Sequence, residues 1–196
     1  MGHPFGPRIL KLTVEDLWRI KRPAGVSLAP DGTRAVCSLT TYSMRENKGT
    51  ASLWLLPTGA GRPRLLTTCG EKDGQPMWAP RGSLIAFVAK REWQGKKDEE
   101  PQIYLIDADG GEARRLTSLA TGCAAIKWFA DGKRIAFVSW VWPDLATDAE
   151  QAKRRKERKE AKVKAHVTER AEFRFWDHWL TDGREPHVHI CDIDLR

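Results

Sequence analysis

Leu28-Ala29-Pro30-Asp31-Gly32 is the stretch that decides the fold, because a related stretch returns twice at a constant distance. Trp78-Ala79-Pro80-Arg81-Gly82 follows 50 residues later, and Trp128-Phe129-Ala130-Asp131-Gly132 follows after another 50. A short apolar run comes soon after each copy. A repeat of roughly 20 to 50 residues is typical of stacked supersecondary units, and strand-forming residues in a unit of this length indicate a propeller blade.

Two further landmarks keep the same distance, so the repeat covers whole units rather than one turn. Leu53-Trp54-Leu55 recurs as Ile103-Tyr104-Leu105, and Arg64-Leu65-Leu66-Thr67 recurs as Arg114-Arg115-Leu116-Thr117. The Asp-Gly pairs favour tight hairpins, and the runs behind them are apolar on both side-chain parities, as in strands covered on both faces. The sequence therefore predicts an all-β fold, an incomplete β-propeller of about three four-stranded blades.

The repeat also sets the domain organisation that we expect. Residues 1–23 are an N-terminal segment, and residues 24–196 are the partial propeller, in units over 24–70, 71–121 and 122–196.

A short helix is expected in the N-terminal segment, over residues 13–20. Thr13 followed by Asp16 resembles a capping box, and Val14, Leu17 and Trp18 then fall on one helical face. That face should pack on the first blade.

The third unit carries an insertion between its second and third strands. His187 to Asp192 aligns with Gln102 to Asp107 at a step of 85, which is 35 more than the period, and we place the insertion over about 143–186. Thr147 and Glu150 have capping-box spacing, and the sequence has no helix breaker before Gly183. We expect a charged, exposed helix over roughly 148–170.

The positive charge of the chain is concentrated in this insertion. Eight Lys or Arg and two Glu lie between Lys153 and Lys164, a local excess of +6 against a formal net charge of +7 for the whole chain. Single-stranded nucleic acid is usually bound by cations interleaved with aromatic side chains, whereas the aromatic residues here follow the charges. A solvated helix or an arm that contacts a protein partner is therefore favoured over nucleic-acid binding.

One pattern admits a metal site. His187, His189 and Cys191 alternate along one face of a predicted strand, and a His-x-His pair on a strand can direct two nitrogens at a zinc ion. The matching positions of the other units favour an ordinary blade face, because their residues do not suggest metal ligands: Ser52, Trp54, Leu56, Gln102, Tyr104 and Ile106. These three residues are weak metal candidates, and no cofactor is expected.

Motifs for catalysis are missing from the sequence. The sequence has no Gly-x-Ser-x-Gly, no glycine-rich phosphate loop after a strand and no His-Glu-x-x-His, so we name no catalytic residue. The four cysteines are far apart in sequence, which favours reduced thiols. With no signal peptide and no apolar run approaching ~20 residues, we expect no membrane association and a cytoplasmic location.

Three stretches together resemble one protein family. Leu12 to Trp18, the Ala29-Pro30-Asp31-Gly32 turn, and Phe173 to Trp179 followed by Gly183 to His187 are similar to the N-terminal propeller of the prolyl oligopeptidase family of serine peptidases. The similarity is to the acylaminoacyl-peptidase and dipeptidyl-aminopeptidase side of that family, and it runs from about Leu12 to Arg196.

The resemblance implies that the propeller and the catalytic site belong to different domains. In this family the propeller precedes an α/β-hydrolase domain that carries the Ser, Asp and His of the active site, and the propeller screens access to that site. None of those catalytic residues has a counterpart here, so the chain should be inactive alone. Its expected function is that of a non-catalytic propeller segment of a serine peptidase, which gates the access of peptides to the hydrolase domain.

Two other functions stay open at this point. One is a TolB-like propeller scaffold that binds a protein partner, and the other is a nucleic-acid-associated protein that uses the basic helix. Propellers close with ~4 to 8 blades, so three units cannot close a ring. We therefore expect an open apolar edge through which the chain could self-associate.

Overall fold

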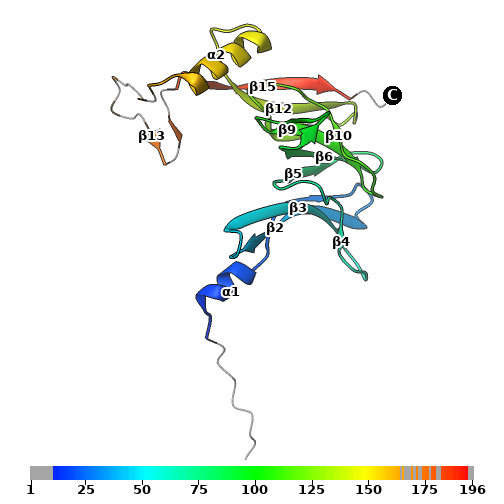
Figure 1. Cartoon of the computed structure of the whole chain (residues 1–196). Coiled ribbons are helices and arrows are strands. Elements are labelled where there is room, and N and C mark those ends of the chain that lie inside the picture. Colours follow the sequence, from blue (N-terminus) through cyan, green and yellow to red (C-terminus); the bar gives the residue numbers. More distant parts are fainter. Residues whose placement is uncertain are drawn as a thin grey trace, which may run out of the picture.

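The computed structural model describes residues 11–163 and 182–193, together with residues 165, 169, 171, 174–176, 178 and 179. It confirms the all-β fold: three antiparallel sheets are stacked face to face along the chain, as blades of a propeller are (Figure 1). Of the aromatic stretch in the insertion, Phe173 and Asp177 lie outside the described residues.

Each repeat forms one sheet, which we call blades 1, 2 and 3. Blade 1 has the order β1-β2-β3-β4, blade 2 the order β5-β6-β9-β10 and blade 3, over the described residues, the order β11-β12-β15. The strands of the blades are β1 (Arg22–Leu28), β2 (Arg34–Ser43), β3 (Lys48–Pro57), β4 (Arg64–Leu65), β5 (Gly74–Trp78), β6 (Leu84–Ala89), β9 (Gln102–Asp107), β10 (Arg114–Arg115), β11 (Ala124–Trp128), β12 (Arg134–Val141) and β15 (Glu185–Asp192).

Two short hairpins stand outside the blades. The first, β7 (Glu92–Trp93) and β8 (Lys96–Lys97), lies between β6 and β9, and the second, β13 (Arg174–Phe175) and β14 (His178–Trp179), lies between β12 and β15. The second hairpin and helix α2 (Asp148–Glu160) interrupt blade 3 between β12 and β15, which confirms a helical insertion in the third blade.

The glycine of each repeated turn adopts the backbone that the sequence predicts. Gly32, Gly82 and Gly132 have φ angles of 70°, 73° and 70°, a region that favours glycine. In blades 1 and 3 the aspartate before the glycine also accepts a hydrogen bond from the backbone two residues on: Asp31 accepts from the N–H of Thr33 and Asp131 from that of Lys133, both at 2.9 Å.

A second repeated feature was not predicted. The first strand of every blade contains a bulge, and Gly25, Gln75 and Ala125, again 50 residues apart, have φ angles of 60°, 50° and 50°. Two of these residues are not glycine, so the bulge is maintained by the packing of the blades rather than by backbone preference.

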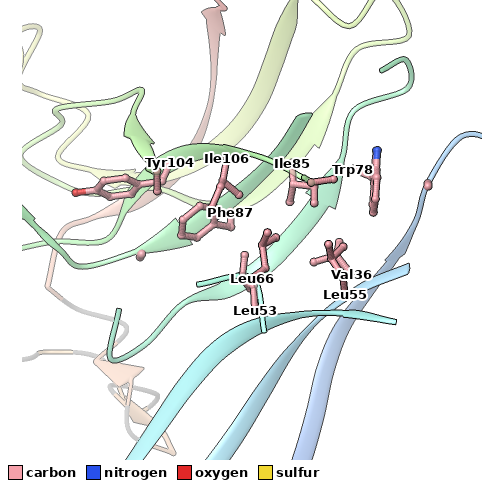
Figure 2. Close-up of a cluster of buried hydrophobic side chains, with 13 residues drawn as sticks. Val36, Leu53, Leu55, Leu66, Trp78, Ile85, Phe87, Tyr104 and Ile106 are labelled. Atoms are coloured by element: carbon pink, nitrogen blue, oxygen red, sulfur yellow. The ribbon is translucent and has the colours of Figure 1, made fainter. Parts of the chain in front are cut away.

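The core lies between the blades. Val36, Leu53 and Leu55 of blade 1 face Ile85 and Phe87 of blade 2, and all five side chains are buried (Figure 2). The opposite face of blade 2 packs on blade 3 in a second cluster: Ala86, Val88, Ile103, Leu105, Cys123, Ile126, Ile135 and Phe137. Blade 2 is therefore covered on both faces, as its apolar strands predict.

The N-terminal helix α1 (Val14–Arg19) begins with the predicted capping box, in which Thr13 and Asp16 exchange hydrogen bonds. It rests against blade 1 through the Trp18 ring, which meets the Tyr42 ring edge to face at 6.0 Å. Its Val14 and Leu17 side chains remain exposed.

The helix of the insertion begins where the sequence predicts and ends earlier. The capping box of Thr147 and Glu150 is present, but α2 stops at Glu160 instead of near residue 170, and Ala161 already has an extended ψ of 132°. A sequence without breakers permits a long helix, whereas tertiary contacts decide how much of it forms. The contacts that fix α2 run from Asp148 to Lys159, as described below.

In the described part of the chain, no helix is long and apolar enough to cross a bilayer.

Candidate functional site: a charged cleft beside the insertion helix

A cleft of about 820 Å³ lies between α2 and the loops of blade 2. Its walls are the β7–β8 hairpin, the segment from Asp98 to Gln102, the loop from Ser118 to Ala120, and one side of α2. Successive strands of a blade are antiparallel, so the connection between the second and third strands emerges at the same end of the blade as the connection to the next blade. These loops therefore lie together at one end of the propeller segment.

One arginine ties the helix across the cleft. Nη1 of Arg155 lies 3.1 Å from Oε2 of Glu99, and its Nη2 lies 2.5 Å from Oε1 of Glu100. Lys159 adds a longer contact, with Nζ 3.6 Å from Oε1 of Glu99. These two cations hold the pKa of the Glu99 carboxyl below its usual range, Lys159 having the larger effect. The cleft is therefore bridged by charge pairs between the insertion and blade 2.

The start of α2 is fixed by a backbone contact. Oδ1 of Asp148 accepts a hydrogen bond from the N–H of Ala120 at 2.9 Å, which joins the first turn of the helix to the loop before blade 3. A carboxylate in the first turn is also the favourable charge for the helix dipole. The first turn of α2 is thus attached to the loop before blade 3, in addition to the charge pairs that Arg155 makes with blade 2.

The other side of α2 is anchored on Trp142. Gln151 is buried; its Nε2 donates to the backbone oxygens of Trp142 and Leu145, and its Oε1 accepts from the N–H of Trp142. Guanidinium groups of Arg154, Arg158 and Arg184 lie 5.8, 5.6 and 5.8 Å from the Trp142 ring centre. Such cation–π contacts favour a fixed rather than a freely moving arm.

A buried polar network in blade 2 reaches the cleft at Asp98. Oδ1 and Oδ2 of the fully buried Asp73 accept hydrogen bonds from Nε and Nη2 of Arg91, at 3.1 and 2.5 Å. The Arg91 guanidinium lies over the Phe87 and Tyr104 rings, and the Tyr104 hydroxyl donates to Oδ2 of Asp98 at 2.6 Å. The network links the connection between blades 1 and 2 to the centre of blade 2.

Asp98 also joins this network to the outer strand of blade 2. Its Oδ1 lies 2.7 Å from Nη2 of Arg115, whereas Nε of Arg115 is buried without a hydrogen-bond partner among the described residues. Burial and the neighbouring Asp98 carboxylate raise the pKa of the Tyr104 phenol. The phenol therefore stays protonated at neutral pH and serves as a hydrogen-bond donor.

The thiols are poorly suited to nucleophilic chemistry. Burial raises the pKa of Cys123 to about 11 and raises the pKa of Cys37 and Cys191 as well. A thiolate is the reactive form, so these three groups are largely unreactive at neutral pH. All four cysteines are free, as the sequence predicts.

The three metal candidates lie on β15, on the face turned toward blade 2. In the strand register His187 is opposite Ser139, His189 opposite Phe137 and Cys191 opposite Ile135. The His189 ring stacks on the Phe137 ring at 5.5 Å, where Tyr104 lies against Phe87 in blade 2 at 5.8 Å. His189 therefore occupies a packing position that the repeat already uses.

The described residues form no cluster of metal-ligating side chains. Within that part of the chain, no group of three or more His, Cys, Asp or Glu side chains could hold a metal ion.

Sequence reasoning missed the residues of the cleft. Glu99 and Glu100 lie more than fifty residues from Arg155, and nothing in their spacing shows that they meet. The one available signal was charge: an acidic run, Asp98-Glu99-Glu100, stands in the loop of blade 2 that corresponds to the insertion point of the basic helix in blade 3.

The fold belongs to the propeller class. Similarity to known proteins indicates which propeller proteins the chain is related to. No family model matches the sequence. The chain is 30% identical over 124 residues, 63% of its length, to the uncharacterized peptidase YuxL of Bacillus subtilis, of which it covers 18%. It is 24% identical over 182 residues, 93% of its length, to dipeptidyl-peptidase 5 of Porphyromonas endodontalis, of which it covers 24%.

The structural comparison confirms the fold. An acylaminoacyl peptidase of Pyrococcus horikoshii matches 90% of this chain with a TM-score of 0.62 at 14% identity, and the match covers 24% of that protein. The relatives in sequence are peptidases and this neighbour in structure is an acylaminoacyl peptidase, which agrees with the N-terminal propeller of a prolyl oligopeptidase-family peptidase. The chain spans about a fifth to a quarter of the length of these proteins. The TolB-like alternative is not favoured.

Proposed function

We propose that this chain is the non-catalytic propeller segment of a serine peptidase and that its insertion limits which peptides reach a hydrolase domain. The observation that carries the proposal is the extent of the relationship to a dipeptidyl-peptidase, which covers 93% of this chain and therefore includes the blades and most of the insertion. The family resemblance implies a hydrolase domain with Ser, Asp and His, and no residue of this chain corresponds to them.

The insertion is the part of the segment that is suited to gating. α2 and the β13–β14 hairpin project from blade 3 at one end of the stacked sheets (Figure 1). The charge pairs of Arg155 and the arginines around Trp142 hold α2 beside blade 2. An arm fixed in this way restricts the space above the loops without taking part in chemistry.

The first test concerns activity. The chain alone is expected to hydrolyse neither acyl-peptide nor dipeptidyl chromogenic substrates, because the resemblance places the nucleophile outside it. Hydrolysis of either substrate by the purified chain, with the same rate across independent preparations and a serine-directed inhibitor abolishing it, would overturn the proposal.

The second test concerns gating. The matched segment of the Porphyromonas dipeptidyl-peptidase is replaced by this chain, and the resulting enzyme is assayed on a dipeptidyl chromogenic substrate and on a long peptide. Shortening the insertion, with residues 146–182 replaced by a short Gly-Ser linker, is expected to raise hydrolysis of the long peptide several-fold relative to the short substrate. Larger openings admit larger substrates, whereas the chemical step is unchanged.

The matched control is Lys153→Gln, which alters the charge of the same helix at a residue for which the structure shows no ion-pair partner among the described residues. It should leave the ratio of long-peptide to short-substrate hydrolysis unchanged. An equal ratio with and without the insertion would contradict gating. Loss of short-substrate hydrolysis in the unshortened hybrid would contradict the equivalence of the two propeller segments.

A further inference from the structure

Every carboxylate that lines the cleft beside α2 already has a partner within the structure. The lining carboxylates are those of Asp98, Glu99, Glu100, Asp148 and Glu160. The first four are held by Arg115, Arg155 and the backbone N–H of Ala120. Oε1 of Glu160 lies 4.0 Å from Nζ of Lys156. The cleft therefore has no unpaired carboxylate with which to attract a cationic ligand.

Two lysines of the lining are not neutralised in the same way. Lys96 of β8 is exposed and forms no ion pair within the described part of the chain. Lys156, on the α2 wall, has only its contact with Glu160, in which both side chains are exposed, and such a pair on a helix surface is weak. Lys97 also lines the cleft, but in the strand register it is opposite Glu92. The hairpin wall and the helix wall thus each carry a lysine that an anionic ligand would neutralise.

The β7–β8 hairpin presents Lys96 together with an aromatic ring. The two residues of its turn, Gln94 and Gly95, have φ angles of 51° and 74°, as in the tight turns that suit a twisted hairpin. Trp93 is opposite Lys96 in the strand register, so both side chains lie on one face of the hairpin, and both line the cleft. A ligand at this wall would meet a cation and an apolar surface side by side.

Both walls of the cleft are fixed before a ligand binds. At the base of the hairpin the N–H of Asp98 donates to the backbone oxygen of Arg91 at 2.8 Å, and the N–H of Arg91 donates to Oδ2 of Asp98 at 3.2 Å. Arg155 attaches the helix wall to Glu99 and Glu100. The volume of about 820 Å³ falls within the roughly 300–1,000 Å³ typical of ligand sites. Binding to preformed walls costs little ordering of the protein.

We propose that this cleft binds acidic segments of peptides, with their carboxylates between Lys96 and Lys156 and an apolar side chain against Trp93. Anionic groups are favoured over cationic ones, since the carboxylates of the cleft are already paired whereas the charge of these two lysines is largely free. The choice of a peptide as the ligand rests on the proposed function. The segment would then select peptides by charge at the same place where its insertion limits their size.

The test is isothermal titration calorimetry of the 196-residue chain with a short peptide rich in Glu with interspersed Leu. Binding is expected, and it should weaken as the salt concentration rises, because the charge pairs are exposed. Lys96→Gln and Lys156→Gln should each weaken binding about threefold, and the double variant about tenfold, as for exposed ion pairs. The matched control is Lys153→Gln, on the same helix but outside the lining of the cleft, which should leave the affinity unchanged. Unchanged far-UV circular dichroism verifies that the variants, all at exposed positions, stay folded.

Further probes decide the chemistry of the ligand. The same peptide with Gln in place of each Glu should bind about tenfold more weakly, because it lacks the charge. No binding of the acidic peptide, or an affinity that is the same in the Lys96→Gln and Lys156→Gln variants, would overturn the proposal. A single-stranded oligonucleotide that binds more tightly than the acidic peptide, through the same two lysines, would overturn it in favour of nucleic acid.

The outcome is separable from that of the gating test, which is the ratio of long-peptide to short-substrate hydrolysis with and without the insertion. A changed ratio together with no binding of the acidic peptide would overturn the present proposal alone. An unchanged ratio together with binding that depends on Lys96 and Lys156 would overturn gating alone.

Discussion

The side-chain oxygen of Gln75 in blade 2 accepts a hydrogen bond from the backbone N–H of Ala125 in blade 3 at 2.8 Å, and the two residues occupy the same position of successive repeats. Both adopt a φ of 50° at a bulge of the first strand. A residue strained in this way also supplies the contact that joins its bulge to the next one.

Replacement of Gln75 separates the strain from the contact. Gln75→Ala should lower the free energy of unfolding by about 1 kcal/mol, because the hydrogen bond to Ala125 is lost while the positive φ is kept. Gln75→Gly loses the same bond but accepts a positive φ without strain, so it should be more stable than Gln75→Ala by about 1 kcal/mol. Urea unfolding followed by circular dichroism measures both; equal stabilities would show that the bulge is not strained.

The Asp73–Arg91 pair should be among the most sensitive interactions in the chain. Arg91→Ala leaves the fully buried Asp73 carboxylate without its guanidinium, and loss of one partner of a buried pair costs about 3–5 kcal/mol. Lys48→Ala, which removes a pair with Glu71 at the surface, is the control and should have a far smaller effect. Similar unfolding midpoints in urea for the two variants would contradict this account.

The stability of the chain should fall as the pH rises from about 9 to about 11, in part because of Cys123. The folded thiol has a pKa raised to about 11 from 9.0 by burial, so the unfolded state loses its proton first and is favoured in that interval. The contribution is fully present below pH 9 and is lost as the pH passes 11. Cys123→Ala should therefore show a shallower decline in unfolding free energy over this interval, and a parallel decline would argue against the buried thiol as its cause.

The attachment of α2 should depend on Arg155. Arg155→Gln removes the charge pairs with Glu99 and Glu100 and should increase the rate of tryptic cleavage within the insertion several-fold, because local opening exposes the chain to protease. Lys153→Gln on the same helix is expected to have no such effect. Raising the ionic strength should accelerate cleavage of the unmodified chain toward that of Arg155→Gln, since salt screens partly exposed charges. No difference between the two variants would refute a charge-based attachment.

The 50-residue repeat in the sequence was sufficient to predict most of the fold. The Asp-Gly turns and the apolar runs behind them predicted the hairpins, and the step of 85 between Gln102 and His187 predicted where the insertion enters blade 3. These features follow from local chemistry, because a positive φ or a two-sided apolar strand is written into neighbouring residues.

The parts that were not predicted depend on contacts between distant residues. Glu99 and Arg155 meet across the cleft, and Asp73 meets Arg91 in the buried network of blade 2, but the spacing of neither pair in the sequence indicates that its members meet. The length of α2 was overestimated for the same reason, since its end at Glu160 reflects where contacts with blade 2 and Trp142 cease to support it. The positive φ of the bulge residues Gln75 and Ala125 was not predicted, because their side chains do not favour that backbone conformation.

The two-sided burial of blade 2 implies an uneven distribution of stability along the chain. In a stack of repeats, each unit is stabilised by the interfaces that it shares, so the central unit has two and each outer unit has one. Amide hydrogens of β6 and β9 should therefore exchange with solvent only when the whole stack opens, whereas those of β1 and β15 exchange through fraying of a single blade. Opening of the middle repeat would remove one stabilising interface from each of its two neighbours at the same time.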